Sequence, residues 1–238
     1  MRVSEPILLL TRPLDASQRF ATLMQDRLGR AVRICISPLL DIVPVSQAVD
    51  FGNANGLVFT SANGVVALSR LTQDRTLPAY CVGTATCEAA RTHGWVATVS
   101  GQDAQSLIAG VSASGIKGPL MHIRGVHSRG DVAKNLTEVG VPTSETIVYD
   151  QVELELNQDA KTLLSGSDAV FVPLFSPRTA ASFQRQVSGT APVYPVALSQ
   201  AVADELRDKC PVAVTPDAQA LALETEKLIN KVCPLEAR

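Results

Sequence analysis

Residues 57–64 read Leu57-Val58-Phe59-Thr60-Ser61-Ala62-Asn63-Gly64, an apolar run that gives way to hydroxyl and small residues. The run predicts a buried strand over 57–60, followed by a helix over 64–71. The same alternation of short apolar runs with helical patterns continues in both directions along the chain. Further strands are expected at 7–11, 32–37, 79–82, 96–99, 120–123, 169–174, 193–198 and 212–214, and further helices at 16–28, 86–93, 103–111, 131–139, 159–164, 179–187, 201–209 and from 217 onward. Such alternation is typical of βαβ units and indicates an α/β protein with mainly parallel sheets.

The chain carries an internal repeat. The matching segments are 57–61 with 170–176, 80–82 with 194–196, 103–107 with 217–221, and 8–12 with 120–124. Matches in several separate elements indicate a duplicated chain with two related α/β lobes. Two extended segments, 38–45 and 145–152, would then form a two-segment hinge between the lobes.

Composition narrows the class of protein. The 238 residues are 46% hydrophobic and 18% charged, which is typical of a globular chain. The formal net charge of −2 argues against a protein that coats nucleic acid. The five cysteines are odd in number and show no C-x-x-C spacing, which argues against a disulfide framework or a zinc site and favours a reducing cytoplasmic setting. We expect no signal peptide and no membrane span, because no apolar run approaches about 18 residues.

Polar turns follow the predicted strands, and in open α/β sheets ligands bind beyond the carboxyl ends of the strands. These turns are Thr11-Arg12-Pro13, Thr60-Ser61-Ala62-Asn63-Gly64, Gly83-Thr84-Ala85-Thr86, Arg124-Gly125, Ser176-Pro177-Arg178-Thr179 and Ser199-Gln200. Backbone N–H groups at helix N-termini with hydroxyls beside them suit carboxylate or phosphate binding. Ser61, Thr86 and Thr179 could equally be helix N-caps, as Asp15 is expected to be. For the set as a whole we favour an anion-binding cleft between the lobes.

Two interpretations are possible for each of three further side chains, Arg12, Arg124 and Tyr149. Arg12 and Arg124 sit at equivalent strand ends, where they could contact a carboxylate or pack as exposed arginines. Tyr149 ends an extended run, where it could simply pack in a strand or donate a proton to a leaving hydroxyl. Each alternative stays open on the sequence alone.

Several common chemistries lack their motifs. Gly125-x-x-x-x-Gly130 resembles a phosphate loop, but Asp131-Val132 stands where Lys-Ser/Thr is needed, so nucleotide hydrolysis is not expected. No G-x-G-x-x-G follows a strand, and His93, His122 and His127 form no metal-ligand pattern.

In combination, the motifs resemble those of the uroporphyrinogen-III synthase family. The resemblance is carried by Leu10-Thr11-Arg12-Pro13, Val58-Phe59-Thr60-Ser61-Ala62-Asn63-Gly64-Val65, Val82-Gly83-Thr84-Ala85-Thr86, Ile123-Arg124-Gly125, Val148-Tyr149 and Phe175-Ser176-Pro177. They occur in order over nearly the whole chain. The resemblance implies two flavodoxin-like lobes: residues 1–37 with 154–238, and residues 46–146. Segments 38–45 and 147–153 would be the linker strands between them.

The resemblance also implies a reaction. Hydroxymethylbilane would lose water, invert its ring D and close to uroporphyrinogen III, with no metal or organic cofactor. The family's tyrosine corresponds to Tyr149, the expected proton donor. The expected substrate-binding residues are Arg12, Thr60, Ser61, Ala62, Asn63, Thr84, Ala85, Thr86, Arg124, Gly125, Ser176, Pro177, Arg178 and Ser199.

The expected partner is the linear tetrapyrrole, which hydroxymethylbilane synthase could hand over to a cytoplasmic monomer. The alternative is a cytoplasmic two-lobed binding or sensor module for a polyanionic small molecule, since a fold does not dictate its chemistry.

Overall fold

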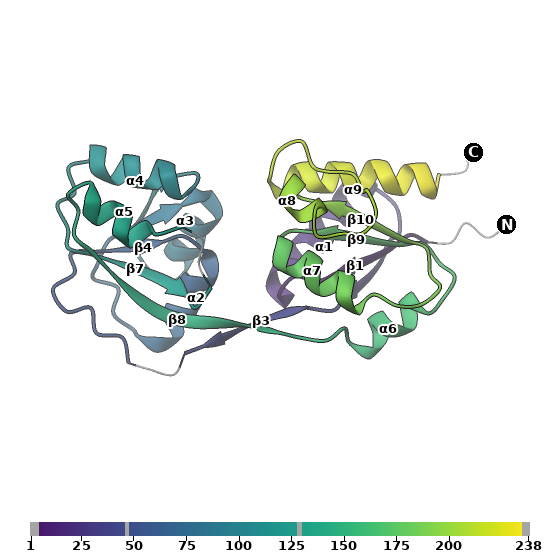
Figure 1. Cartoon of the computed structure of the whole chain (residues 1–238), viewed down its shortest axis with the longest axis horizontal. Coiled ribbons are helices and arrows are strands. Elements are labelled where there is room, and N and C mark those ends of the chain that lie inside the picture. Colours follow the sequence, from purple (N-terminus) through teal and green to yellow (C-terminus); the bar gives the residue numbers. More distant parts are fainter. Residues whose placement is uncertain (1–4, 46–47, 128–129, 235–238) are drawn as a thin grey trace. The chain divides into compact units, whose positions relative to one another are not determined.

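The computed structural model describes residues 5–45, 48–127 and 130–234, which fold as two compact units (Figure 1). Unit 1 takes in the described residues up to Asp41 and those from Glu153 onward, and unit 2 runs from Ile42 to Val152. The chain therefore leaves unit 1 after its first βαβ segment and returns to it after unit 2 is complete.

Unit 1 is built on a four-stranded parallel sheet with the strand order β10-β9-β1-β2. Its strands are β1 (Ile7–Leu10), β2 (Arg33–Ile36), β9 (Val170–Leu174) and β10 (Val193–Ala197). Its helices are α1 (Leu14–Leu28), α6 (Gln158–Leu164), α7 (Pro177–Gln186), α8 (Gln200–Ala203) and α9 (Ala218–Val232).

Helices cover both faces of the unit 1 sheet. Leu9 packs with the buried side chains of α6, α7 and α8, whereas Leu8 and Leu10 pack with those of α1 and α9. Successive strand residues point to opposite faces, so a strand that is covered on both sides must be apolar throughout. This explains why β1 and β9 are continuous apolar runs.

Unit 2 is built on a six-stranded sheet with the strand order β3-β8-β7-β4-β5-β6. Its strands are β3 (Leu40–Pro44), β4 (Gly56–Phe59), β5 (Ala79–Val82), β6 (Ala97–Gly101), β7 (Leu120–Gly125) and β8 (Thr143–Glu153). Its helices are α2 (Ala62–Leu71), α3 (Gly83–Thr92), α4 (Ala104–Ala113) and α5 (Val132–Glu138).

The unit 2 sheet is also covered on both faces. Leu57 and Phe59 pack with α2 and α3, whereas Val58 packs with α4 and α5. The strands from β8 to β6 are parallel. The segment expected as an extended connector, 38–45, contains β3, which runs antiparallel to β8: Val45 N–H donates to Val148 O, and Leu154 N–H to Leu39 O.

The two sheets share one topology. The order β10-β9-β1-β2 in unit 1 matches β5-β4-β7-β8 in unit 2. Three of the four sequence repeats fall on these pairs of strands, and the fourth falls on the N-termini of α4 and α9. The strand ends that carry Arg12 and Arg124 are equivalent in this match, as are the turns that carry Ser61 and Ser176. The predicted duplication and the α/β class are confirmed.

Some local predictions were wrong. The strand expected at 212–214 is reduced to one bridge between Ala197 and Val212, and the helix expected at 201–209 ends at Ala203. Asp15 lies in the first turn of α1 and does not cap it, because α1 begins at Leu14 behind Pro13. In the two helices, the difference lies in where the helix begins or ends.

Gly110 marks a close contact between α4 and β6. A Cβ atom at this position would collide with the carbonyl oxygen of Ser100, so the helix can approach the strand only because residue 110 has no side chain. Alanine is otherwise the better helix former by roughly 0.5–1 kcal/mol.

We expect Gly110→Ala to lower the free energy of unfolding by about 1–3 kcal/mol, because overpacking outweighs helix propensity here. Urea unfolding followed by circular dichroism measures it. Ser112→Ala, at an exposed position of the same helix, is the control and should change stability by less than about 0.5 kcal/mol. An equally stable Gly110→Ala protein would contradict the close packing.

Candidate active site

The turn after β4 begins α2 and holds four of the predicted site residues, 60–63, all partly exposed. Ser61 is the N-cap of α2: its backbone is extended, and its Oγ accepts a hydrogen bond from the backbone N–H of Asn63 at 3.2 Å. The capping interpretation is therefore confirmed for Ser61. Capping leaves the hydroxyl proton of Ser61 available to a second partner.

Tyr149 is that second partner. It lies on β8 opposite Gly125 of β7, and Val126 N–H donates to its carbonyl oxygen at 2.9 Å. The phenol hydrogen-bonds to Ser61, and the residue is only 4% exposed. A Cβ atom on Gly125 would lie 2.6 Å from two ring carbons, so the ring packs directly on the glycine.

Burial determines the protonation of Tyr149. It raises the pKa of the phenol above its ordinary value, and the bond from Ser61 offsets only part of this effect. The side chain is therefore a neutral phenol at physiological pH and can donate a proton.

The turn after β5 differs from the prediction. Helix α3 begins at Gly83, so Thr84 and Ala85 lie exposed in its first turn while Thr86 is buried inside the helix. Thr86 is not an N-cap, because the chain turns into the helix three residues earlier than the pattern indicated. Val82 occupies the cap position and offers no side-chain hydrogen bond.

Arg124 already has an anionic partner. Its Nε donates to Glu145 Oε2 at 2.8 Å, and its NH1 donates to the carbonyl oxygen of Gly125 at 3.0 Å. The glutamate lies on the neighbouring strand β8, where residue 145 pairs with His122 of β7. Sequence inspection missed Glu145, since only the strand register brings it beside Arg124.

His122 is a buried member of the same group. Its Nε2 lies 3.1 Å from Thr60 Oγ1, and its Nδ1 lies 3.5 Å from Glu145 Oε1. Within the described parts of the chain, Nδ1 has no hydrogen-bond partner. His122 is a core residue, 1% exposed, and its hydrogen bond to Thr60 connects it to the turn that carries Ser61.

In unit 1, Arg12 follows β1 and has no carboxylate partner among the residues that the structure describes. Its guanidinium lies 4.0 Å above the centre of the Phe175 ring. Burial, and after it the charge of Arg19, lowers the pKa of Arg12 to about 10, so the group remains a cation at neutral pH. Two nearby cations and an aromatic face make this position attractive to an anion.

The turn after β9 caps α7. Ser176 is the N-cap: its Oγ accepts from Thr179 N–H at 3.2 Å and donates to Thr179 Oγ1 at 2.9 Å. Thr179 was expected to cap the helix and does not, because Pro177 already occupies the first turn. Arg178 is partly exposed, near Glu153. Ser199 precedes α8 and makes no side-chain cap bond.

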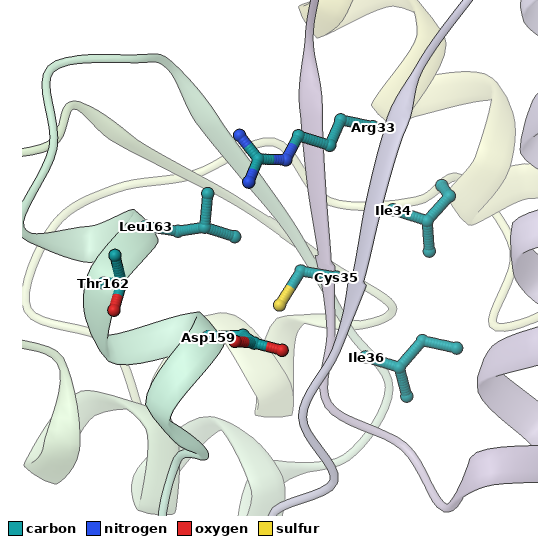
Figure 2. Close-up of a pocket in the computed structure, with 7 residues that line it drawn as sticks. All are labelled: Arg33, Ile34, Cys35, Ile36, Asp159, Thr162 and Leu163. Carbon is teal, nitrogen blue, oxygen red and sulfur yellow. The ribbon is translucent and has the colours of Figure 1, made fainter.

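A pocket lies elsewhere in unit 1, between β2 and α6 (Figure 2). Its volume is about 330 Å³, and no predicted site residue lines it. Arg33 and Cys35 face α6, whereas Ile34 and Ile36 point away to the other side of the strand. The pocket residues are Arg33, Ile34, Cys35, Ile36, Asp159, Thr162 and Leu163.

Residues 5–45, 48–127 and 130–234 contain neither a membrane-spanning helix nor a metal-binding cluster. No helix there is both long and apolar enough to cross a membrane. No three His, Cys, Asp or Glu side chains there gather in a way that could hold a metal ion.

Comparison with known proteins identifies the family. The family model described as uroporphyrinogen-III synthase HemD matches residues 20–223, which is most of the chain. The chain belongs to the uroporphyrinogen-III synthase family. A search of curated proteins finds no match.

A solved structure of a uroporphyrinogen-III synthase shares the fold. The enzyme from Helicobacter pylori matches at 15% identity with a TM-score of 0.69, over 94% of this chain and 100% of that one. A mutant enzyme from Thermus thermophilus matches at 13% identity with a TM-score of 0.49, over 96% of this chain and 100% of that one. The first match shows the two-lobed α/β fold.

Family membership supplies the reaction. Hydroxymethylbilane loses water, its ring D inverts, and the macrocycle closes to uroporphyrinogen III as a step of haem biosynthesis. The alternative of a binding or sensor module is not favoured.

The buried phenol makes a pH-dependent prediction. Because the folded-state pKa of Tyr149 is raised, its contribution to stability is complete below the unfolded pKa of about 10 and is lost as pH rises through the folded value. Between pH 9 and 11, wild-type protein should therefore lose more stability than Tyr149→Phe. Urea midpoints across this range measure the difference, and parallel curves would contradict the raised pKa.

Proposed function

We propose that Tyr149 is the proton donor for loss of the substrate's hydroxyl. Water leaves hydroxymethylbilane when the C–O bond of its hydroxymethyl group breaks, and the departing oxygen must gain a proton. The pyrrole ring supplies the electron pair that replaces the bond, which leaves an azafulvene-like cation. The observation that carries the proposal is the neutral phenol held beside Ser61 at the carboxyl end of β4.

Ser61 supports this role through its own hydrogen bonds. Its oxygen accepts from Asn63 N–H, and its single proton can be donated to the phenol oxygen of Tyr149. The phenol proton is then free for the leaving hydroxyl. As the proton departs, the bond from Ser61 stabilises the phenolate that forms, and the N-terminus of α2 adds a favourable dipole.

Arg12 is proposed as a carboxylate site on unit 1. The substrate carries acetate and propionate groups, each of which can accept two hydrogen bonds from one guanidinium. Arg12 is cationic and has no carboxylate partner among the described residues, whereas Arg124 is already paired with Glu145. Of the two equivalent arginines, Arg12 is therefore better suited to bind the substrate directly.

For the other predicted substrate-binding residues, we propose contacts through backbone atoms instead of side chains. Partly exposed or exposed residues at strand ends, including Thr84, Ala85 and Ser199, would bind carboxylates chiefly through backbone N–H groups. The side chain of Thr86 is buried inside α3 and is not proposed to contact the substrate. At this turn, backbone N–H groups would donate hydrogen bonds to the substrate carboxylate instead.

We also propose a cytoplasmic monomer that receives its substrate from hydroxymethylbilane synthase. All five cysteines are free, which suits a reducing compartment. Light scattering of the purified chain should give the mass of one copy, 25.2 kDa.

Tyr149→Phe tests the proton donor. We expect kcat to fall about 100-fold, because acid catalysis is lost while the ring still packs on Gly125. Hydroxymethylbilane is generated enzymatically, the products are oxidised, and uroporphyrin isomers I and III are separated. Tyr80→Phe in the same unit is the matched control and should keep wild-type turnover. An unchanged kcat in Tyr149→Phe would remove the proposed role.

Arg12→Gln tests the carboxylate site. Loss of a charged hydrogen-bond donor should raise KM about 10-fold or more. The urea midpoint should not fall, because the change removes a partly buried cation that lies near Arg19. Arg207→Gln, an exposed change in the same unit, controls for net charge. A normal KM with reduced stability would instead mark Arg12 as a structural residue.

A further inference from the structure

Three polar side chains line up across neighbouring strands of unit 2. Thr60 follows β4, His122 lies on β7 and Glu145 lies on β8. Thr60 Oγ1 is 3.1 Å from His122 Nε2, and His122 Nδ1 is 3.5 Å from Glu145 Oε1. The histidine side chain is 1% exposed, the glutamate side chain is 34% exposed, and Thr60 is partly exposed.

The position of the histidine proton follows from this geometry. Burial lowers the pKa of His122, and Glu145 offsets only part of that effect, so the ring is neutral and carries one proton. A proton on Nε2 would leave the bare Nδ1 facing a carboxylate oxygen 3.5 Å away, which places two acceptors close together. A proton on Nδ1 instead gives a favourable electrostatic contact with Glu145 Oε1, which lies 3.5 Å from Nδ1 without forming a hydrogen bond and belongs to the carboxylate that Arg124 holds at 2.8 Å.

With the ring proton on Nδ1, the bare Nε2 must accept the hydroxyl proton of Thr60. A threonine hydroxyl has one proton and two lone pairs. Once that proton is directed to His122, Thr60 Oγ1 can only accept hydrogen bonds from anything else that approaches it. Thr60 is therefore unsuited to a carboxylate, which at neutral pH also only accepts.

We propose that Thr60 accepts a hydrogen bond from a pyrrole N–H of the linear tetrapyrrole, with His122 and Glu145 as positioning residues. The inference rests on the proposed function and changes the expected role of Thr60 from a carboxylate donor to a pyrrole acceptor. Pyrrole N–H groups are donors only, so they complement an oxygen whose own proton is already used. Because Thr60 precedes Ser61, this contact would place a ring of the substrate near the Tyr149 phenol.

The first experiment reads the tautomer of His122 without any reaction. Long-range proton–nitrogen NMR of ¹⁵N-labelled full-length protein at pH 8 distinguishes the Nδ1–H ring from the Nε2–H ring. His93→Gln and His127→Gln variants assign the signals. His93 gives an internal reference, because its Nδ1 lies 2.9 Å from the carbonyl oxygen of Ala89 and must donate to it.

The expected result is the Nδ1–H form of His122, both in the free protein and with uroporphyrinogen III bound under reducing conditions. An Nε2–H ring in the free protein would overturn the proposal. A change to Nε2–H when the product binds would also overturn it, because Thr60 would then be free to donate to a carboxylate.

The second experiment separates binding from chemistry. Thr60→Val keeps the shape of the side chain and removes the acceptor, so KM should rise about 3- to 10-fold with kcat nearly unchanged. Thr60→Ser should restore most of the loss. Thr98→Val, at an exposed strand position of the same unit, is the control. An unchanged KM in Thr60→Val would overturn the proposal.

The two experiments also separate this inference from the proposed function. Tyr149→Phe is expected to lower kcat, whereas Thr60→Val is expected to raise KM. If Tyr149→Phe turned over normally, the proton-donor role would fall, while the tautomer of His122 and the KM of Thr60→Val would still decide the role of Thr60.

Discussion

The packing of the Tyr149 ring on Gly125 connects the fold of unit 2 to its chemistry. The two residues are opposite each other in the parallel ladder of β7 and β8, and only a residue without a side chain leaves room for the ring. This contact holds the phenol beside Ser61, which also caps α2. Strand register, helix capping and the protonation of a buried phenol therefore depend on one another. A shift of β8 by one residue would move the tyrosine to the opposite face of the sheet.

Electrostatics distinguishes two arginines that occupy equivalent strand ends. Arg124 is neutralised by Glu145 on the next strand. Arg12 has the Phe175 ring and the cation Arg19 as its neighbours. No ion pair with a described residue therefore offsets the desolvation of its guanidinium. A partly buried cation without an ion-pair partner carries a desolvation cost, and an anion that binds to it offsets this cost. The two repeats thus have an arginine at the same position, but its neighbours are different: a carboxylate in unit 2, and an aromatic ring with a second cation in unit 1.

The hydroxyl groups of Ser61 and Thr60 have different roles because their protons are directed to different partners. Ser61 accepts from the helix backbone and can give its proton to Tyr149, while Thr60, in the proposed tautomer of His122, gives its proton to the ring. The two neighbouring hydroxyls therefore interact differently with a substrate. Ser61 supports the proton donor Tyr149, whereas Thr60 offers lone pairs that accept a hydrogen bond. Neither property is visible from residue type alone, since serine and threonine can both donate and accept.

The sequence by itself determined the α/β class, the duplication and the family, because each follows from local periodicity or from motifs that are contiguous in the chain. It did not determine that Thr86 faces the core, that Ser176 rather than Thr179 caps α7, or that Glu145 neutralises Arg124. Those facts depend on where each helix begins and on which residues face one another across parallel strands. Parallel partners are separated by a whole crossover, as Arg124 and Glu145 are, so no local pattern records their register. Only tertiary structure could pair Thr60 with His122 and leave Arg12 with no carboxylate partner in the described part of the chain.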